Sequence, residues 1–527
     1  MTRPSAIGSS TARDRLAGAL DRLSRGFQRR IAIDLRGLAA LRIALGALLI
    51  LDLLLRARDL STFYTDDGVL PLEALFADYS SVYSLHALSG EAWVQALLFL
   101  VAGVFALALL VGYRTRIATI VSWLLLLSLH VRNPMILHGG DVLLRMLLFW
   151  SIFLPLGERW SIDARRLDRD RTTVASIGTM ALLAQVVLMY VVNAVHKTRG
   201  DLWMEGEAVV HTFQADQYTY LLGPVLADHH ALLGLFGYAW MGLLLLAPLL
   251  VVLTGVRRTV FTTLFVGMHL GMFVTIRIDV FPLIVVAALL AFYPPVFWDG
   301  AIGLATRVGI ADRLRVGLER LQRTAPTLPA SPLSSAARAA LPSVPNRDWI
   351  RATGRTAFQT VVPWFFLVLV VLSNAQAVDY AEVPDPAEEV LETVEADQDW
   401  QLFAPEPVTQ TRWLVVPGQL ADGTEIDLRD GTDVSLDRPP NVDQRFDTSR
   451  ERKYLASMRS TSNENHRSYY ASYLCERWNA DHDGDEELES LTIYGMTDTA
   501  DLDDEEPDVS RYTLLEYDCS GAFVQNE

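Results

Sequence analysis

Two lysines stand out in a chain that otherwise uses arginine as its basic residue. The 527 residues include Lys197, Lys453 and 43 arginines, and Lys197 ends an apolar segment in the stretch NAVHKTRGDLWMEG. Arginine stays charged, whereas a buried lysine can lose its proton. Lys197 therefore has the chemistry of a general base toward a weak acid such as a phenol, whose pKa is about 10. The alternative is a lysine that extends its amine to the membrane surface.

Other polar side chains follow apolar segments in four separate stretches, where they could form one pocket. They are Asp66 and Asp67; Arg132, Asn133, His138, Asp141 and Arg145; His196, Trp203 and Glu205; and His269, Arg277 and Asp279. Ionisable groups at membrane depth are costly and often functional. Each also has a structural alternative: a turn at Asp66-Asp67-Gly68, a helix cap at Asp141, a core hydrogen bond at His269, and ion pairs for the arginines.

Long apolar segments must position these residues. The chain is 51% hydrophobic, with a mean hydropathy of +0.23. A membrane-spanning helix needs about 20 apolar residues. We predict nine such helices, at 38–55, 93–112, 117–131, 142–156, 174–195, 231–253, 260–276, 280–297 and 357–375. The expected fold is an all-α polytopic membrane bundle with a C-terminal, β-rich α+β domain.

The arginines predict how this bundle is oriented. Nine spans with a cytoplasmic N-terminus place the arginines of the tail, of 113–116, of 157–171, of 254–259 and of 298–356 on one side. We therefore expect a multi-pass protein of the cell membrane. Residues 1–37 are polar and carry arginines, with no short apolar stretch before a small-residue cleavage site, so we expect no removable signal peptide. Its expected parts are a basic cytoplasmic tail (1–37), a membrane domain (38–297), a cytoplasmic Pro/Ala/Arg-rich linker with an amphipathic helix (298–356), a final membrane helix (357–375) and an extracytoplasmic domain (376–527).

The C-terminal domain is strongly acidic. Residues 376–527 carry a net charge of −26, against −17 for the whole chain. Such a surface is typical of halophilic, archaeal-like proteins, and an ordinary solvated acidic face is the alternative. The stretch RWLVVPGQLADGTEIDL predicts a hairpin turning at Asp422-Gly423, ELESLTIYGMT and RYTLLEYDCSGAFV predict strands, and HRSYYASYLCERWNA predicts a helix. A disulfide between Cys475 and Cys519 is left open, and no cysteine spacing indicates a metal site.

Several stretches together resemble the vitamin K-dependent gamma-glutamyl carboxylases and their prokaryotic relatives, the horizontally transferred transmembrane (HTTM) domain proteins. They are YVVNAVHKTRGDLWMEGEAV, GMHLGMFVTIRIDVFPLIVVAALLAFYPPVFW, FYTDDGVLP, RNPMILHGGDVLLRMLLFWSIFLPLGERWSID and DWQLFAPEP. The resemblance extends over roughly 30–300 and, less fully, over 355–430.

The resemblance implies a function. Lys197 matches the lysine that deprotonates reduced vitamin K, whose reaction with dioxygen yields the epoxide and drives addition of carbon dioxide to glutamate. The sequence departs from the family where His196 replaces one lysine of a pair, and where Arg132-Asn133-Pro134 replaces an Asn-His pair. Carboxylation of a glutamate-containing protein or peptide is therefore left open.

The leading hypothesis is a membrane enzyme that uses a menaquinol-like naphthoquinol and dioxygen. Lys197 is the expected base. The expected pocket residues are Arg132, Asn133, His138, Asp141, His196, Trp203, Glu205 and His269. No metal and no nucleic-acid partner are expected. The alternatives are a non-enzymatic membrane protein that binds quinone or lipid or acts as a scaffold, and a transporter, against which the sparse charges in the helix centres argue.

Overall fold

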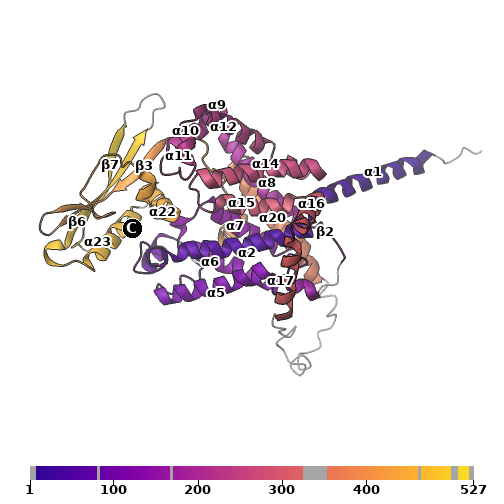
Figure 1. The fold of residues 1–527 in the computed structure, drawn as a ribbon, viewed down its shortest axis with the longest axis horizontal. Helices are drawn as coiled ribbons and strands as arrows, with labels where there is room; N and C mark the ends of the chain where they lie inside the picture. Colours follow the sequence, from indigo (N-terminus) through magenta and orange to yellow (C-terminus); the bar gives the residue numbers. More distant parts are fainter. Residues whose placement is uncertain are drawn as a thin grey trace, which may run out of the picture.

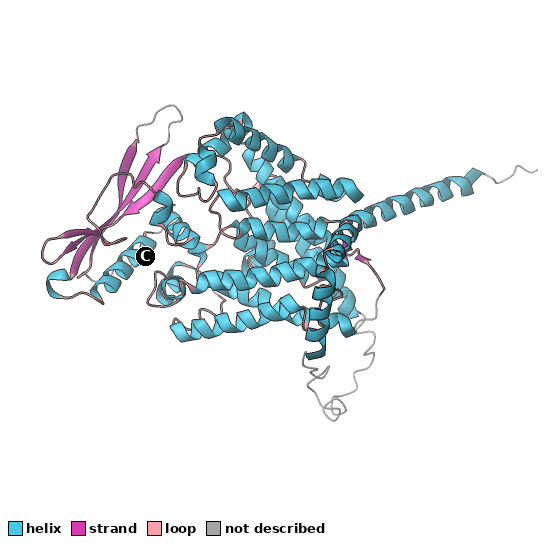
Figure 2. Ribbon diagram, in the orientation of Figure 1, coloured by secondary structure: helices cyan, strands magenta, loops and turns pink. Residues whose placement is uncertain are grey.

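The computed structural model describes residues 8–79, 83–166, 170–324, 353–460, 464–499 and 508–521. A helical bundle forms most of it, and a sheet-containing C-terminal domain lies at one end of that bundle (Figures 1 and 2). Helix α1 (Gly8–Ile31) projects from the opposite end. The Pro/Ala/Ser-rich part of the expected linker, 325–352, lies outside the described residues.

Five helical segments within the described ranges are long and apolar enough to cross a membrane, so this is a multi-pass membrane protein by its helices. They are α2 (Leu35–Ala57), α5 (Ala92–Val111), α6 (Thr115–Arg132), α8 (Ile177–Lys197) and the segment Thr353–Ala377, which contains η4 (Ala357–Val361) and α20 (Val362–Ala377). A sixth is counted if the segment Phe281–Phe292 and α16 (Pro295–Arg307), which meet at 107°, form one bent span.

The prediction of nine spans is therefore not confirmed. The other predicted segments do coincide with helices, but these are shorter or more polar than a regular span. They are α7 (Gly139–Ser151), α12 (His230–Leu245) with α13 (Leu249–Val252), α14 (Gly255–Thr275), and α15 (Phe281–Leu289) with η3 (Leu290–Phe292). Helix α14 contains Arg257, Arg258 and His269, which lower its apolarity.

Short elements connect these helices. They are β1 (Ile33–Asp34), α3 (Leu60–Tyr64), α4 (Leu72–Asp78), η1 (Pro134–Ile136), η2 (Asp163–Arg166), β2 (Thr173–Val174), α9 (Asp201–Glu205), α10 (Ala208–Gln214), α11 (Gly223–Ala227), α17 (Ile310–Thr324) and α21 (Asp385–Thr393). Helix α17 buries no residue and belongs to the segment expected to be a linker.

Capping residues define where α7 and α8, which carry site residues, begin. Ser176 and Thr179 cap the start of α8 reciprocally, which satisfies N–H groups that have no partner within the helix. His138 and Asp141 cap α7 in the same way: the Gly140 N–H donates to His138 Nδ1, and the His138 N–H donates to Asp141. The predicted cap at Asp141 is present.

The arginine-bearing segments gather at the bundle end opposite the sheet (Figure 1). Arg36 is 2.7 Å from Asp299, Arg258 donates to the Arg30 carbonyl, and Arg165 donates to the Gln322 carbonyl. Segments grouped by the orientation argument thus lie together. Which side of the membrane this end faces stays a prediction.

The C-terminal domain contains the elements expected from its sequence. The strands are β3 (Gln410–Val415), β4 (Pro417–Leu420), β5 (Glu425–Asp427), β6 (Leu488–Thr499) and β7 (Val509–Asp518). The long β6 pairs antiparallel with β3, β4 and β7, and β4 and β5 form the predicted hairpin around Gly423, whose φ of +86° favours glycine. The helices are η5 (Val442–Arg445), α22 (Ser449–Ser460), α23 (Asn465–Asn479) and η6 (Gly484–Glu486).

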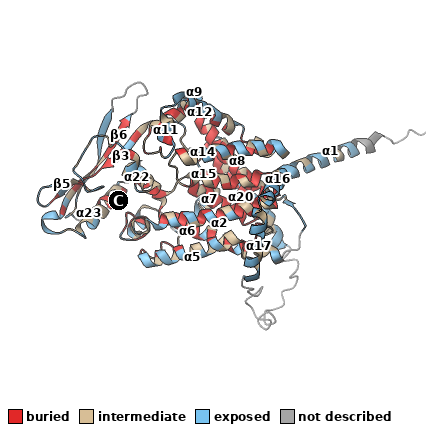
Figure 3. Cartoon of the chain, viewed as in Figure 1, coloured by how far each residue is buried: buried red, intermediate tan, exposed pale blue. Residues whose placement is uncertain are grey.

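This domain packs directly on the bundle. A buried apolar cluster combines Phe63 and Tyr64 of the bundle end with Trp413, Tyr454 and Met458 of the domain, and buried residues run from the bundle toward it (Figure 3). Cys475 and Cys519 form a disulfide, which joins α23 to the end of β7.

Candidate functional site

A cavity of about 780 Å³ lies where the bundle meets the C-terminal domain. Ligand pockets usually occupy about 300–1,000 Å³, with apolar walls and a few polar groups. Among the described residues, its polar and aromatic lining includes His138, Tyr190, Asn193, Lys197, Trp203, Tyr218, Trp240, His269, Asp279, Ser449, Arg452 and Lys453. The bundle and the domain therefore both build its wall.

Lys197 projects from the last turn of α8 into this wall and is only 2% exposed. Its Nζ donates to the carbonyls of Leu402 (3.0 Å) and Phe403 (3.1 Å), and it lies 3.2 Å from the centre of the Trp203 ring. No carboxylate pairs with it in the part of the chain that the structure describes. Carbonyl dipoles and an indole face are thus its electrostatic partners.

The segment 400–403, which accepts these bonds, is held by further donors. Asn193, one turn before Lys197, donates to the Trp400 carbonyl at 2.8 Å and to the Leu402 carbonyl at 3.2 Å. Trp203 Nε1 donates to the Phe403 carbonyl at 2.8 Å. Phe403 has a φ of +57°, a conformation that is uncommon for a bulky residue. These bonds fix the segment, and with it the position of the lysine amine.

His269 lies on the α14 side of the cavity, 1% exposed, and packs against the rings of Tyr190 and Trp240. Its Nδ1 is 2.9 Å from the Phe265 carbonyl, which can only accept. Neutral His269 therefore carries its proton on Nδ1, and its Nε2, which contacts no described donor or acceptor, keeps a lone pair. The Tyr190 hydroxyl, also at the cavity, is buried without a partner among the described residues.

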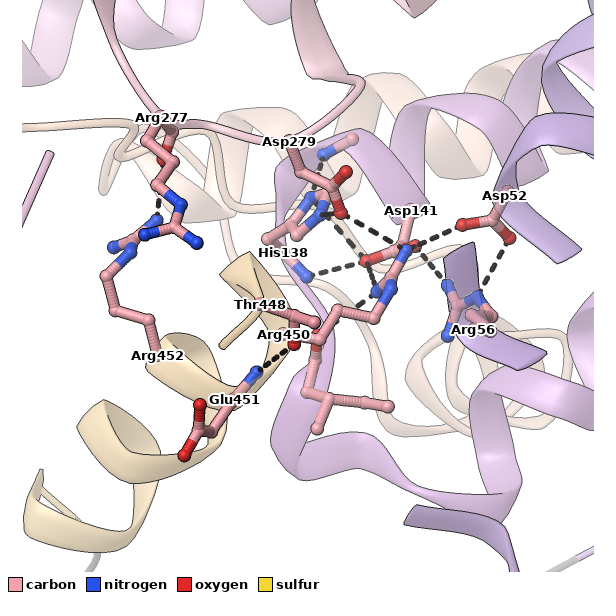
Figure 4. Close-up of polar contacts among 12 residues, drawn as sticks. Asp52, Arg56, His138, Asp141, Arg277, Asp279, Thr448, Arg450, Glu451 and Arg452 are labelled. Atoms are coloured by element: carbon pink, nitrogen blue, oxygen red, sulfur yellow. Dashed lines mark hydrogen bonds and ion pairs between the residues drawn. The ribbon is translucent and has the colours of Figure 1, made fainter. Parts of the chain in front are cut away.

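His138 and Asp279 form the part of the wall next to the domain. The Gly140 N–H occupies His138 Nδ1, so Nε2 carries the proton and donates to Asp279 at 3.1 Å. Burial alone would raise the pKa of Asp279, but the hydrogen bond from His138 and the charge of Arg450 outweigh it and lower this pKa to about 2. Asp279 is therefore ionised at neutral pH and fixes the ring of His138 (Figure 4).

Lys453, the only other lysine, lines the same cavity from α22 of the C-terminal domain. It makes no hydrogen bond or ion pair with the described residues. Burial and the neighbouring charge of Arg452 lower its pKa. Lys453 was not among the site residues predicted from the sequence, although the rarity of lysine applies to it as much as to Lys197. Both lysines of the chain line this cavity.

Arg132 and Asn133 hold a neighbouring loop in place and do not line the cavity. Arg132 donates to the carbonyls of Leu70 (2.8 Å) and Thr65 (3.3 Å), and Asn133 donates to the Phe63 carbonyl (3.0 Å). Both side chains thus donate to backbone carbonyls within residues 63–70. The prediction that they line the pocket does not match their positions.

Three further predicted pocket residues also lie elsewhere. His196 turns away from the cavity, with its Nε2 at 3.3 Å from Asp399, because consecutive residues of α8 point in different directions. Glu205 is exposed. Asp141 is buried in an ion-pair network behind the wall, at 2.5 Å from Arg56 and 3.1 Å from Arg450 (Figure 4).

His138, Lys197, Trp203 and His269 are thus the predicted site residues that line the cavity together. Within the ranges that the structure describes, no group of three or more His, Cys, Asp or Glu side chains could hold a metal ion.

Comparison with known proteins gives one match. The family model of the HTTM domain matches residues 31–298, just over half of the chain. Searches among curated proteins and among solved structures found no match. The matched region contains the helices that carry Lys197 and His269, and it ends before the C-terminal domain that completes the cavity. The chain belongs to the HTTM domain family.

Proposed function

We propose that this protein is a membrane enzyme that deprotonates a reduced naphthoquinone and lets it react with dioxygen, with Lys197 as the base. One observation carries the proposal: a buried lysine without a carboxylate partner among the described residues lies at the wall of a large, mostly apolar cavity. Such a cavity suits a hydrophobic weak acid, and an amine is the group that can take its proton.

The cavity fits the head and tail of a membrane quinol. Met189, Phe213, Trp240 and Phe281 contribute apolar surface for a ring system. Leu222 and Phe236 also line the cavity and are 55% and 41% exposed on the outside of the bundle. The cavity wall is therefore continuous with apolar outer surface, through which an isoprenoid tail can remain in the lipid.

The contacts of Lys197 suit proton uptake. A neutral amine keeps two N–H groups, which match the carbonyls of Leu402 and Phe403, and has one lone pair for an incoming proton. After uptake, the ammonium is stabilised by the same carbonyls and by the face of Trp203. Elsewhere on the cavity wall, His269 Nε2 can accept a hydrogen bond from the second hydroxyl of the quinol.

When bound, the reduced naphthoquinone supplies the electrons, and its reaction with one dioxygen gives the epoxide and water. Carbon dioxide and a glutamate-containing protein or peptide enter only if this oxidation is coupled to carboxylation. We include in the proposal the cytoplasmic N-terminus, the extracytoplasmic C-terminal domain and a halophilic host, for which the arginine distribution and the acidic domain are the support.

The test is formation of the epoxide from reduced menaquinone by purified protein in high salt, with and without dioxygen. We expect oxygen-dependent epoxide from the wild type and a loss of at least about 100-fold in Lys197→Ala and Lys197→Arg, since general bases contribute about 10²–10⁴. Arg315→Ala, on the exposed α17, is the control and should keep full activity. If folded wild-type protein binds the quinone but forms no epoxide, the proposal that it is an enzyme is wrong.

A second candidate function follows from the same contacts. Lys197 also holds residues 402 and 403, so it is equally suited to a structural role in a cavity that binds quinone or lipid without turnover. In that case Lys197→Ala lowers thermal stability and quinone affinity together. The enzyme hypothesis instead predicts that Lys197→Arg abolishes turnover while quinone binding remains.

A further inference from the structure

A second pocket, of about 310 Å³, lies in the C-terminal domain next to the main cavity. It is formed by β3, α22 and the segment around Gln217 and Tyr218. Arg412, Arg452 and Arg459 line it, and none of its described lining residues is Asp or Glu. Three cationic side chains without an acidic partner are notable here, because residues 376–527 carry a net charge of −26.

Several other arginines of the domain are paired with carboxylates. Arg429 is 2.9 Å from Glu451, Arg438 is 2.7 Å from Asp216, and Arg445 is 2.6 Å from Asp427. The acidic composition therefore supplies counter-charges readily, and their absence from the described wall of the second pocket is a local property of that pocket.

The three pocket arginines instead contact neutral groups. Arg459 Nε donates to the Tyr512 hydroxyl at 2.8 Å, and Arg412 donates to the Gln410 side chain at 3.1 Å. Arg452 donates to the Arg277 carbonyl at 2.7 Å and stacks 4.1 Å from the centre of the Tyr218 ring. None of these contacts neutralises the charge of a guanidinium, so the pocket is lined by three positive charges without a carboxylate beside them among the described lining residues.

Arg452 also has a buried donor at this pocket: its Nε–H has no acceptor among the described residues. A buried donor without an acceptor is destabilising, so such groups usually have a partner. An oxyanion in the pocket would supply an acceptor for this N–H and a negative charge for the three arginines.

The remaining wall is apolar and is formed by Leu414, Phe446, Leu455 and Ala456. An inorganic anion would leave this surface without a partner, whereas a carboxylate on a short carbon chain would cover it. We propose that the second pocket is a binding site for a small carboxylate-bearing molecule, recognised by Arg412, Arg452 and Arg459. The proposal does not rest on the proposed quinol chemistry, although Tyr218 and Arg452 line both the pocket and the main cavity.

Calorimetric titration of the full-length protein, in detergent at constant ionic strength, tests this site. Butyrate is the probe, butyramide is its uncharged analogue, and phosphate is an oxyanion without a carbon chain. We expect butyrate to bind at least about tenfold more tightly than either, which is the effect of one charge-assisted hydrogen bond. No binding of butyrate, or equal binding of butyramide or phosphate, would overturn the proposal.

Three variants assign the binding to this pocket. Arg459→Gln and Arg412→Gln each remove one charge from the pocket, and each should weaken butyrate binding at least about fivefold. Arg511→Gln, on the exposed face of β7 outside the pocket, is the control and should bind butyrate as the wild type does. Unchanged affinity in both pocket variants would place the butyrate elsewhere and contradict the proposal.

Discussion

Arg450 of the C-terminal domain donates a 2.6 Å hydrogen bond to Asp52, near the C-terminal end of α2 (Figure 4). The same guanidinium reaches Asp141 at 3.1 Å and lies 3.6 Å from Asp279. Both Arg450 and Asp52 are almost fully buried. One side chain of the domain is thus a counter-ion for carboxylates from three segments of the bundle, and it fixes the domain against the bundle.

The first prediction concerns the removal of this counter-ion. Arg450→Met should destabilise the protein by about 3–5 kcal/mol, because Asp52 and Asp141 would then share the single guanidinium of Arg56, which leaves one more buried negative charge uncompensated. Arg199→Met is the matched control: Arg199 pairs with the exposed Asp379, and such surface pairs contribute about 0–1 kcal/mol. Thermal unfolding in detergent measures both. Equal small losses for the two variants would contradict a central role for Arg450.

The second prediction is an acid-dependent loss of stability through Asp279. Its pKa, which burial alone would raise, is lowered to about 2 by His138 and Arg450, from an ordinary value of 3.8. The stabilisation is therefore complete above pH 3.8 and declines as the pH falls toward 2. The shift corresponds to about 2 kcal/mol.

Asp279→Asn tests it. The difference in unfolding free energy between the wild type and this variant should shrink as the pH is lowered from 5 to about 2.5. Asp433→Asn, at an exposed position, should follow the wild-type curve. A wild-type advantage that is constant over this range would mean that Asp279 does not contribute through its charge.

The sequence predicted the local elements better than the tertiary contacts. The C-terminal hairpin, its other strands and helix α23 follow from alternation, turn residues and helical periodicity, which are local properties. Helices also occupy the expected apolar segments, but hydropathy does not reveal that α7 ends at Ser151 or that the chain bends by 107° after Phe292. Those features depend on packing between segments that are distant in sequence.

The same distinction applies to the candidate site. The type and position of Lys197, His138 and His269 were informative, because ionisable residues beside apolar segments are costly. Nothing local indicates that Arg132 and Asn133 serve the 63–70 loop, or that Arg450 enters the bundle. Lys453 was missing from the predicted site residues. The sequence shows that lysine is rare in this chain, but only the fold of the C-terminal domain shows that Lys453 lies at the cavity.

The third prediction concerns this second lysine. Burial and Arg452 lower the pKa of Lys453 below its ordinary 10.5, so the folded state binds this proton less tightly than the unfolded state. Stability should therefore rise with pH between the lowered pKa and 10.5, through Lys453. Neither Lys453→Met nor Lys453→Arg should show this part of the rise, because methionine has no charge and arginine keeps its charge. Unfolding curves from pH 7 to 10 that run parallel in all three proteins would contradict it.

The last prediction concerns how a quinol tail would reach the cavity. Gly267 and Gly271 of α14 line the cavity, and a Cβ added at either position would have no atom within 4 Å. Positions four residues apart share one helix face, so the pair leaves an open groove along α14. Leu222 and Phe236, which are exposed on the outer surface, line the same cavity. The proposed tail would lie in this groove.

Gly271→Leu fills the groove without a helix penalty, because leucine favours helix more than glycine does. Displacement of a labelled quinone should show at least about tenfold weaker binding of a long-tailed menaquinone, since lost apolar contacts amount to about 1–3 kcal/mol. The tail-less analogue should bind unchanged. Gly303→Leu on α16, which also has open space but lies outside the cavity lining, should affect neither. Equal loss of both quinones in Gly271→Leu would mean that the groove holds the ring and that the tail leaves the cavity by another path.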